Sequence, residues 1–383
     1  MDKKNKNPNV PNLRFNNDPY KKYNLYEFAT RVTRKNKDNV SNLPLTISAQ
    51  YGLVDQVSFF NKTVASKDMS GYYLLKNGEF AYNKSYSNDY PWGAIKRLDL
   101  YDMGCLSTLY ICFKTNDNIV NSNYLVHYFE SSKWHKQVAD IAGEGARNHG
   151  LLNIAVNDFF NTKHAVPTIE NQIKIAGFLD LIEKRIQTQI KIINDYKILK
   201  NHIIKSYIKQ NGTSYLLSEI AELGRGRVIN SAEISKQKNP IYPVYSSQTS
   251  NNGIMGYLDN YDYEGEYITW TTDGANAGTV YYRNGKFNCT NVCGILKIKN
   301  GYDAYYISNI LNCYTKKYVS TNLANPKLMN NVMANIKINL PSAEQQKHSS
   351  KILQSIEYRV EIEEDIKLNL VKQKAFLLKN MFI

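Results

Sequence analysis

The chain has 383 residues, 43% of them hydrophobic, and a formal net charge of +14 at pH 7. This length predicts two to three domains with cores of their own, and the charge indicates either a polyanionic partner or a solubility charge with no specific partner. The polar start "MDKKNKNPNVPNLRF" lacks the apolar core of a signal peptide, and no run of about eighteen apolar residues is present, so we expect a cytoplasmic protein with no membrane partner.

The five cysteines do not indicate a disulfide framework or a metal site. Their number is odd, their spacing is irregular and no Cys-x-x-Cys pair is present. Cys289 and Cys293 have no nearby histidine that would complete a zinc site. We therefore expect reduced, mostly buried thiols and no metal.

Taken in order, the chain predicts a globular part, a long helix, a second globular part and a second long helix. The globular parts, 1–166 and 212–340, contain β-rich runs such as "LSTLYICFK", broken by turn signals and by shorter helical stretches. The helices are expected at 167–211 and 341–383. The predicted fold class is α+β: two β-rich mixed domains related by an internal repeat and separated by two long antiparallel coiled-coil helices.

The helical segments are predicted from apolar residues at steps of three and four. Pro167 and Pro341 stand where proline is tolerated at a helix start, and Glu170 and Glu344 suit the positive end of the helix dipole. About forty residues give a length of about 60 Å. Two such helices can bury their apolar stripes on each other as an antiparallel pair. The alternative is that each helix packs only on its own domain.

The second helical segment repeats the first. Laying 167–208 over 341–382 without a gap pairs ten identical residues. Periodicity alone does not explain the shared Pro-x-x-Glu-x-Gln opening, so we interpret the repeat as real. The identical pairs are Pro167/Pro341, Glu170/Glu344, Gln172/Gln346, Leu179/Leu353, Ile182/Ile356, Glu183/Glu357, Arg185/Arg359, Ile192/Ile366, Lys200/Lys374 and Lys205/Lys379.

The repeat extends into the globular parts. "LYEFA" at 25–29 resembles "LSEIA" at 217–221, and "GEFAYNK" from Gly78 resembles "GEYITWT" from Gly265. "PLTISAQ" at 44–50 likewise resembles "PVYSSQ" at 243–248, and "RNHGLLN" at 147–153 resembles "ANPKLMN" at 324–330. Each match is weak, but their common order predicts two related halves.

Catalytic signatures are missing from the sequence. It contains no Walker-type phosphate loop, no "FxGxG" turn for S-adenosylmethionine and no His-Glu-x-x-His motif. The dense "WTTDGANAG" at 270–278 is better explained as a turn-rich loop that offers polar side chains to a partner. We therefore expect no catalysis by this chain alone.

A variable domain followed by a long helix that opens Pro-x-x-Glu-x-Gln, and then the same again, resembles the specificity (S) subunit of type I restriction–modification systems. "PNLRF" at 11–15, "IENQIKIAGFLDLIEKRI" from Ile169 and "LLKNMF" at 377–382 carry the resemblance. It covers essentially the whole chain. The second helix departs from the pattern, because "EQQKHSSKIL" is polar where the first copy reads "NQIKIAGFL".

The resemblance implies a non-catalytic subunit whose two target recognition domains read the halves of a bipartite, asymmetric site in double-stranded DNA. The helices would act as spacer and as dock for two adenine-N6 methyltransferase (M) subunits, and a motor-nuclease (R) subunit can join them. S-adenosylmethionine, ATP and Mg would belong to those partners, leaving this chain without a cofactor. Two unlike domains on a rigid spacer should also meet unlike half-sites at a fixed separation.

Side chains on loops that can reach base edges are the candidate DNA-binding residues: Arg or Lys for guanine, and Asn or Gln for adenine. In the first domain these are Arg31, Arg34, Lys35, Ser48, Gln50, Lys84, Tyr86, Arg147 and Asn148. In the second domain they are Arg225, Arg227, Ser247, Gln248, Thr272, Asp273, Asn276, Asn325 and Lys327. For each one an ordinary solvated surface role is the alternative.

For partner binding the candidates are Glu170, Gln172, Glu344 and Gln346, whose alternative role is helix capping. Three other functions stay open at this stage. A divergent methyltransferase or nuclease would bind S-adenosylmethionine or metal by itself, and a stand-alone general nucleic-acid binder would be competed by scrambled DNA. An interaction protein that uses no DNA would show no tight, salt-dependent and sequence-selective binding.

Overall fold

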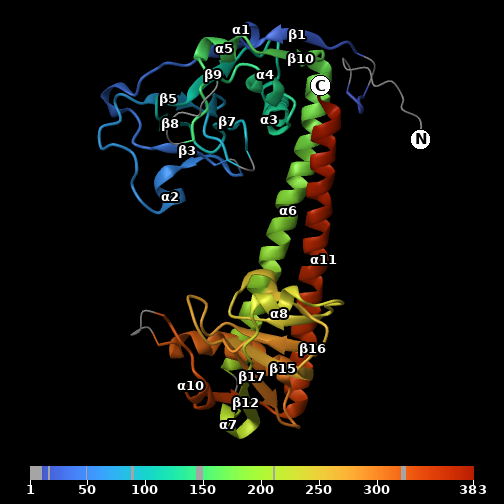
Figure 1. Ribbon diagram of the computed structural model, residues 1–383. Helices are drawn as coiled ribbons and strands as arrows, with labels where there is room; N and C mark the ends of the chain where they lie inside the picture. The colour runs from blue at the N-terminus through green and yellow to red at the C-terminus, as the bar shows by residue number, and fades with distance from the viewer. Residues whose placement is uncertain are drawn as a thin grey trace, which may run out of the picture. The chain divides into compact units, whose positions relative to one another are not determined.

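A computed structural model describes residues 11–15, 18–48, 50–87, 90–143, 150–209, 212–320 and 325–383. Its internal contacts divide the chain into a first unit, residues 1–190 with 366–383, and a second unit, residues 191–365. Each unit therefore combines one β-rich domain with parts of both long helices (Figure 1). No helix in the described part of the chain is long and apolar enough to cross a membrane.

The first domain is built around a four-stranded antiparallel sheet of order β2-β9-β6-β7, with the pairs β3-β4 and β5-β8 beside it. Its strands are β1 (Lys21–Asn24), β2 (Ala29–Arg31), β3 (Leu45–Ser48), β4 (Gly52–Asp55), β5 (Tyr73–Lys76), β6 (Phe80–Asn83), β7 (Ala94–Arg97), β8 (Met103–Leu106), β9 (Ile111–Thr115) and β10 (Lys163–Val166). Its helices are α1 (Leu25–Phe28), η1 (Lys37–Asn39), α2 (Gln56–Phe60), α3 (Ser122–Glu130), α4 (His135–Ala139) and α5 (Val156–Phe160).

The second domain is built around a six-stranded sheet of order β12-β17-β15-β16-β13-β14. Its strands are β11 (Thr213–Leu216), β12 (Ala221–Arg225), β13 (Tyr242–Tyr245), β14 (Ile254–Leu258), β15 (Tyr263–Thr271), β16 (Val280–Cys289), β17 (Cys293–Ile298) and β18 (Lys337–Leu340). Its helices are α7 (Leu217–Ile220), α8 (Ser231–Ser235), η2 (Ser250–Gly253), α9 (Ala304–Tyr314), η3 (Thr315–Tyr318) and α10 (Asn330–Ala334).

The two sheets share one strand order, which confirms the internal repeat. The order β2-β9-β6-β7 corresponds to β12-β17-β15-β16. The registers also correspond, since Phe80 lies opposite Phe113 and Ile268 lies opposite Leu296. Phe80 is thus equivalent to Ile268, and the alignment of Gly78 with Gly265 is one residue out of register. The two glycines differ in place, because Gly78 ends a turn whereas Gly265 lies inside the longer β15.

Each domain joins its long helix through a two-stranded ribbon. β1 pairs with β10 so that Lys21 lies opposite Val166, and β11 pairs with β18 so that Thr213 lies opposite Leu340. The turn after each ribbon begins in the same way, because Glu27 accepts a hydrogen bond from the backbone N–H of Asn24 and Glu219 accepts one from that of Leu216. The chain therefore enters and leaves each domain at neighbouring residues.

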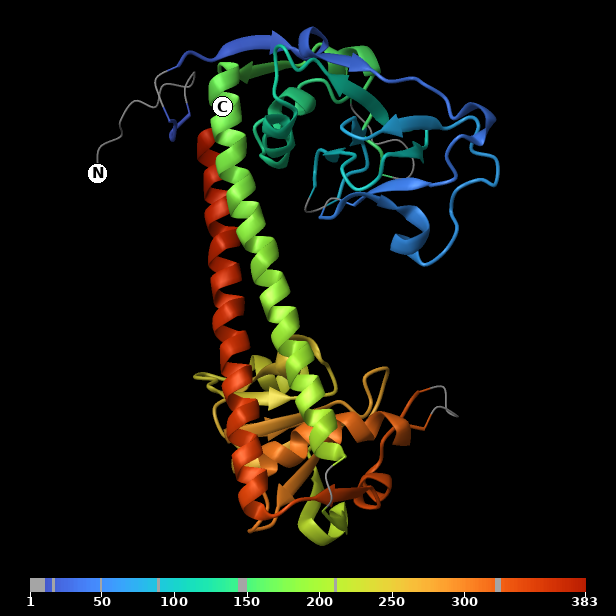
Figure 2. The same cartoon turned by 180° about the vertical axis from the view of Figure 1, so that it is seen from behind.

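The two long helices are α6 (Ile169–Ile208) and α11 (Ala343–Met381). They run antiparallel and lie side by side in both views (Figures 1 and 2), because Lys374 pairs with Glu183 at 2.7 Å and Glu357 pairs with Lys200 at 2.9 Å. All four residues belong to identical pairs of the sequence repeat, Glu183/Glu357 and Lys200/Lys374. The two ion pairs therefore lie at equivalent positions of the repeat.

The long helices pack on each other and also contribute to the domain cores. Both packing alternatives considered for the sequence therefore apply. In the first unit Leu179 of α6 and Phe382, just after α11, are fully buried in one cluster with Tyr124 of the first domain. In the second unit Ile204 of α6 and Leu353 of α11 lie in one cluster with Trp270. The helices are thus part of each core as well as a pair.

Gln172 and Gln346 have an internal role, and their contact with a partner stays a prediction. Gln172 is fully buried, accepts a hydrogen bond from the N–H of Asn121 at 2.7 Å and donates to the Pro167 carbonyl at 2.8 Å. Gln346, 2% exposed, makes the same contacts with Asp303 and with the carbonyl of Pro341. Asn121 and Asp303 cap α3 and α9. The motif therefore fastens each domain to its helix.

Candidate nucleic-acid interface

In each domain the segment after the central strand is hydrogen-bonded to the segment before the last short helix. The N–H of Leu152 donates to the carbonyl of Lys84 at 2.9 Å, and the N–H of Leu328 donates to the carbonyl of Thr272 at 2.9 Å. Lys84 is therefore equivalent to Thr272, in agreement with the strand register. Candidate segments that are far apart in the sequence adjoin at the same place in both domains.

The second domain gathers four of its candidate residues into one cluster. The Nη2 atom of Arg225 lies 3.2 Å from the Thr272 hydroxyl and 3.5 Å from an Asp273 carboxylate oxygen. The Nζ atom of Lys327 lies 3.5 Å from the other Asp273 oxygen. Arg225 and Lys327 both remain more than a third exposed. One carboxylate thus orients two cations whose remaining donors face solvent, as base or phosphate contacts need.

Four further candidates lie on loops of this domain. The Asn276 amide donates to the Thr249 hydroxyl at 3.2 Å, which links the β15–β16 loop to the loop after β13. Ser247 and Gln248 are half-buried in that second loop, and the Gln248 amide donates to the carbonyl of Ile254. Exposed Asn325 lies beside Gly274. These side chains mostly shape the loops, and their base contacts stay a prediction.

Arg227 is held by two carboxylates. Its guanidinium lies 2.6 Å from Glu233 and 3.0 Å from Asp262. The hydrogen bond with Glu233, the largest cause, raises the pKa of Arg227, and the same bond lowers the pKa of Glu233. A paired but 41% exposed guanidinium can position the β12–α8 segment, and a direct DNA contact stays a prediction.

In the first domain, three candidate cations surround β5. Lys35 donates to the Gly71 carbonyl at 2.8 Å and lies 4.4 Å from the ring centre of Tyr73. Arg31 lies 3.4 Å from the hydroxyl of the same tyrosine. Arg34 is used in an ion pair with the nearly buried Glu79, at 2.6 Å. All three cations thus have contacts within the domain, and their contacts with DNA stay a prediction.

Three further first-domain candidates lie on the loops that follow β6 and β3. Tyr86 is about half exposed and its N–H donates to the carbonyl of Gly150 at 3.0 Å, while Lys84 reaches the carbonyl of Ile154 at 3.4 Å. Gln50 is exposed at the mouth of a cavity described below. Arg147 and Asn148 lie outside the described residues.

Two candidate hydroxyls are buried. Ser48 is 7% exposed, and its oxygen accepts the N–H of Tyr51 at 3.1 Å. Thr272 is fully buried between Arg225 and Asp273 and donates to the latter at 2.5 Å. Both hydroxyls hold turns in place, and a contact of these residues with DNA stays a prediction.

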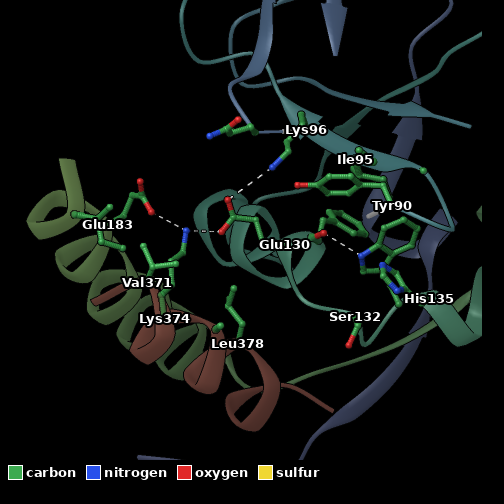
Figure 3. A pocket seen from close by; sticks show the side chains of 17 residues that line it. Tyr90, Ile95, Lys96, Glu130, Ser132, His135, Glu183, Val371, Lys374 and Leu378 are labelled. Atoms are coloured by element: carbon green, nitrogen blue, oxygen red, sulfur yellow. Dashed lines mark hydrogen bonds and ion pairs between the residues drawn. The ribbon is translucent and has the colours of Figure 1, made fainter. Parts of the chain in front are cut away.

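A cavity of about 460 Å³ lies in the first unit, between β7, α3 and the two long helices (Figure 3). Its charged side chains bind each other: Lys374 lies 2.8 Å from Glu130 and 2.7 Å from Glu183, and Lys96 lies 3.8 Å from Glu130. Burial raises the pKa of Glu130, but hydrogen bonds and the two lysines outweigh it and lower that pKa to about 2. The network fastens α11 to the first domain.

Sequence reasoning missed this network and a buried arginine, Arg283, in the second domain. The identities Glu183/Glu357 and Lys200/Lys374 carried a signal for the helix ion pairs, but nothing local pointed to Glu130. Four of the cysteines are buried and free, and Cys313 is exposed and free. The described residues contain no group of three or more metal-ligating His, Cys, Asp or Glu side chains.

Known proteins match both the sequence and the fold. The family model of the type I restriction modification DNA specificity domain matches residues 211–373. A Mycoplasma pneumoniae protein designated a type I specificity subunit is 38% identical over 196 residues, which cover 50% of this chain and 81% of the relative. The type I restriction enzyme MpnII specificity subunit of the same species is 39% identical over 172 residues, or 44% of this chain and 51% of that one.

Among solved structures, the crystal structure of a type I restriction–modification S subunit from M. genitalium has the same fold, with a TM-score of 0.60. At 15% identity it covers 98% of this chain and 99% of its own. A chain from a study of complex assembly and conformational transition of the type I R-M system gives a TM-score of 0.59 at 15% identity, covering 96% of this chain and 99% of that one.

Fold and matches define a DNA specificity protein. The chain belongs to the family of type I restriction–modification specificity subunits. These are non-catalytic subunits, and catalysis lies in the other subunits of the enzyme.

Proposed function

We propose that this chain reads a bipartite, asymmetric DNA sequence, with one half of the site assigned to each β-rich domain. The observation that carries the proposal is the shared strand order with equivalent loops that bear different side chains: Lys84 corresponds to Thr272, and Tyr86 corresponds to Gly274. Equivalent scaffolds with unlike contact residues suit unlike half-sites. The net charge of +14 supports phosphate contacts, which set position without reading sequence.

We further propose that the exposed faces of the two long helices dock two adenine-N6 methyltransferase subunits, which can recruit a motor-nuclease subunit. Glu170 and Glu344 are exposed at equivalent helix starts. The neighbouring exposed positions differ in chemistry, since Ile173 and Leu181 of α6 correspond to Lys347 and Ser355 of α11. The two docks are therefore expected to be unequal. S-adenosylmethionine, ATP and Mg are assigned to the partner subunits.

The test is to exchange residues 213–340 for the second domain of another specificity subunit. The junctions are suitable because Thr213 and Leu340 are opposite each other in one ribbon. Gly212 should be kept, since a Cβ there would lie 2.4 Å from the Leu340 carbonyl oxygen. We expect the hybrid, assembled with its methyltransferase, to select DNA in which only one half of the site has changed.

The matched control exchanges residues 21–166, whose ends also lie opposite each other, and should change the other half. A hybrid in which both halves changed would contradict the assignment of one half-site to each domain. Equal competition by scrambled DNA against the unaltered chain would identify a general nucleic-acid binder instead.

A further inference from the structure

The guanidinium of Arg283 is a buried cation in the second domain. Arg283 lies on β16 and is 4% exposed. It lies between two aromatic rings, 3.6 Å from the ring centre of Tyr245 and 4.4 Å from that of Tyr281. A buried charge is normally compensated by an opposite charge, but here the two ring faces supply much of the attraction.

The hydrogen bonds of Arg283 connect the sheet to a loop. Its Nε donates to the hydroxyl of fully buried Thr269 on β15 at 3.2 Å. Its Nη2 donates to the backbone carbonyl of Asn252 at 2.9 Å. The planar fork of the guanidinium makes both contacts possible at once. Arg283 thus ties a surface loop to the centre of the sheet.

The loop that it holds, Ser246–Gly253, has an unusual backbone. Asn251, Asn252 and Gly253 all have positive φ, of 48°, 51° and 83°. Asparagine tolerates this left-handed region better than most residues, but such conformations persist only where the surroundings fix them. The N–H of Ser246 closes the loop by donating to the carbonyl of Gly253 at 2.9 Å. The hydrogen bond from Arg283 to the Asn252 carbonyl holds this loop against the sheet.

The fold does not require a cation at this place. Arg283 lies opposite Tyr267 in the ladder, and the equivalent residue of the first domain is Leu98, whose N–H donates to the carbonyl of Glu79. Leu98 is fully buried in an apolar cluster, and Ala81 stands at the place of Thr269. Because the same sheet forms with leucine there, the arginine serves something specific to the second domain.

We propose that Arg283 is a positioning residue for DNA recognition, and that it presents the loop Ser246–Gly253 so that the exposed Asn251 amide reads an adenine edge in the second half-site. Asparagine matches the paired donor and acceptor of adenine in the major groove. The bent loop fixes the direction of that amide before DNA arrives, which is what selective rather than merely tight binding needs. This inference rests on the proposed two-domain recognition of DNA.

The test uses the chain assembled with its methyltransferase and measures competition between the cognate site and sites altered in either half. Arg283→Met should lose discrimination in the second half by about tenfold or more and retain discrimination in the first half. Arg283→Lys keeps the charge but not the fork, so its loss should be intermediate. Discrimination that is unchanged in Arg283→Met, or lost equally in both halves, would overturn the proposal.

A second pair of variants decides the matter if Arg283→Met does not fold. Asn251→Gly keeps the left-handed backbone but removes the reading amide, whereas Asn252→Gly keeps the carbonyl that Arg283 binds. We expect the first to lose second-half discrimination and the second to retain it. Equal effects would sink the assignment. Failure of the proposed function is distinct, since the unaltered complex would then select no sequence.

Discussion

Replacing Lys374 with methionine is expected to destabilise the first unit by about 2–4 kcal/mol, somewhat less than the loss of one partner from a fully buried ion pair. Lys374 is 15% exposed and lies between Glu130 and Glu183. Methionine would keep most of the packing but leave two carboxylates facing each other. Hydrogen exchange of residues 122–130 and 366–381 under mild urea measures the loss.

The loss should depend on pH in a defined direction. The pKa of Glu130 is lowered from an ordinary 4.5 to about 2, so its contribution is present above pH 4.5 and disappears as the pH falls towards 2. Burial lowers the pKa of Lys374, but its attraction to and hydrogen bonds with Glu130 and Glu183 together outweigh this and raise that pKa. The contribution of Lys374 is therefore present below the unfolded pKa and disappears as the pH rises through the raised value. The difference between the unaltered chain and the variant should be largest near neutral pH.

The matched control is Lys197→Met. Lys197 pairs with Glu364 at 2.7 Å, but both side chains are about half exposed, so the expected change is only about 0–1 kcal/mol. Equal losses for Lys197→Met and Lys374→Met would show that burial of the network contributes nothing.

Lengthening both long helices by four residues is expected to lengthen the recognised site or to abolish recognition. The insertions belong after Ile190 in α6 and after Asp365 in α11, where the boundary between the two units crosses both helices. Four residues add about 6 Å along a helix, which corresponds to about two base pairs of DNA. We therefore expect a gap between half-sites that is about two base pairs longer, read by selection from a random DNA library.

The paired design keeps the ion pairs on both sides of the insertion, such as Glu183 with Lys374 and Lys200 with Glu357, in register. An insertion in α6 alone is the control, and it should destabilise the helix pair because it shifts one helix against the other. Selection of an unchanged gap by the doubly lengthened chain would mean that the helices do not set the spacing.

The helices and the repeat were predictable because their signals are local and periodic. Apolar steps of three and four predicted α6 and α11, and the order of short matches predicted two related halves. The Pro-x-x-Glu-x-Gln motif was found from the sequence, but the internal role of its glutamines was not. Gln172 and Gln346 lie on buried helix faces, and only the tertiary structure shows the backbone groups of Asn121 and Asp303 that they bind.

The candidate site was predictable only in part. Arg225, Asp273 and Lys327 were singled out from separate loops and lie together, because equivalent turns of a repeat meet at equivalent places. Arg283 was missed, since a lone arginine in a strand gives no sign that two tyrosines and a loop carbonyl will surround it. Such contacts are set by strand pairing across the sheet, which residue spacing does not reveal.

The most direct test of the central claim is to co-express this chain with a methyltransferase subunit of a type I system that assembles with it, and to map modified bases in the host DNA. We predict N6-methyladenine in both halves of one split sequence motif, and none when this chain is omitted. A soluble complex that contains both proteins but adds no sequence-specific methylation would contradict the claim, and methylation by this chain alone would contradict its non-catalytic role.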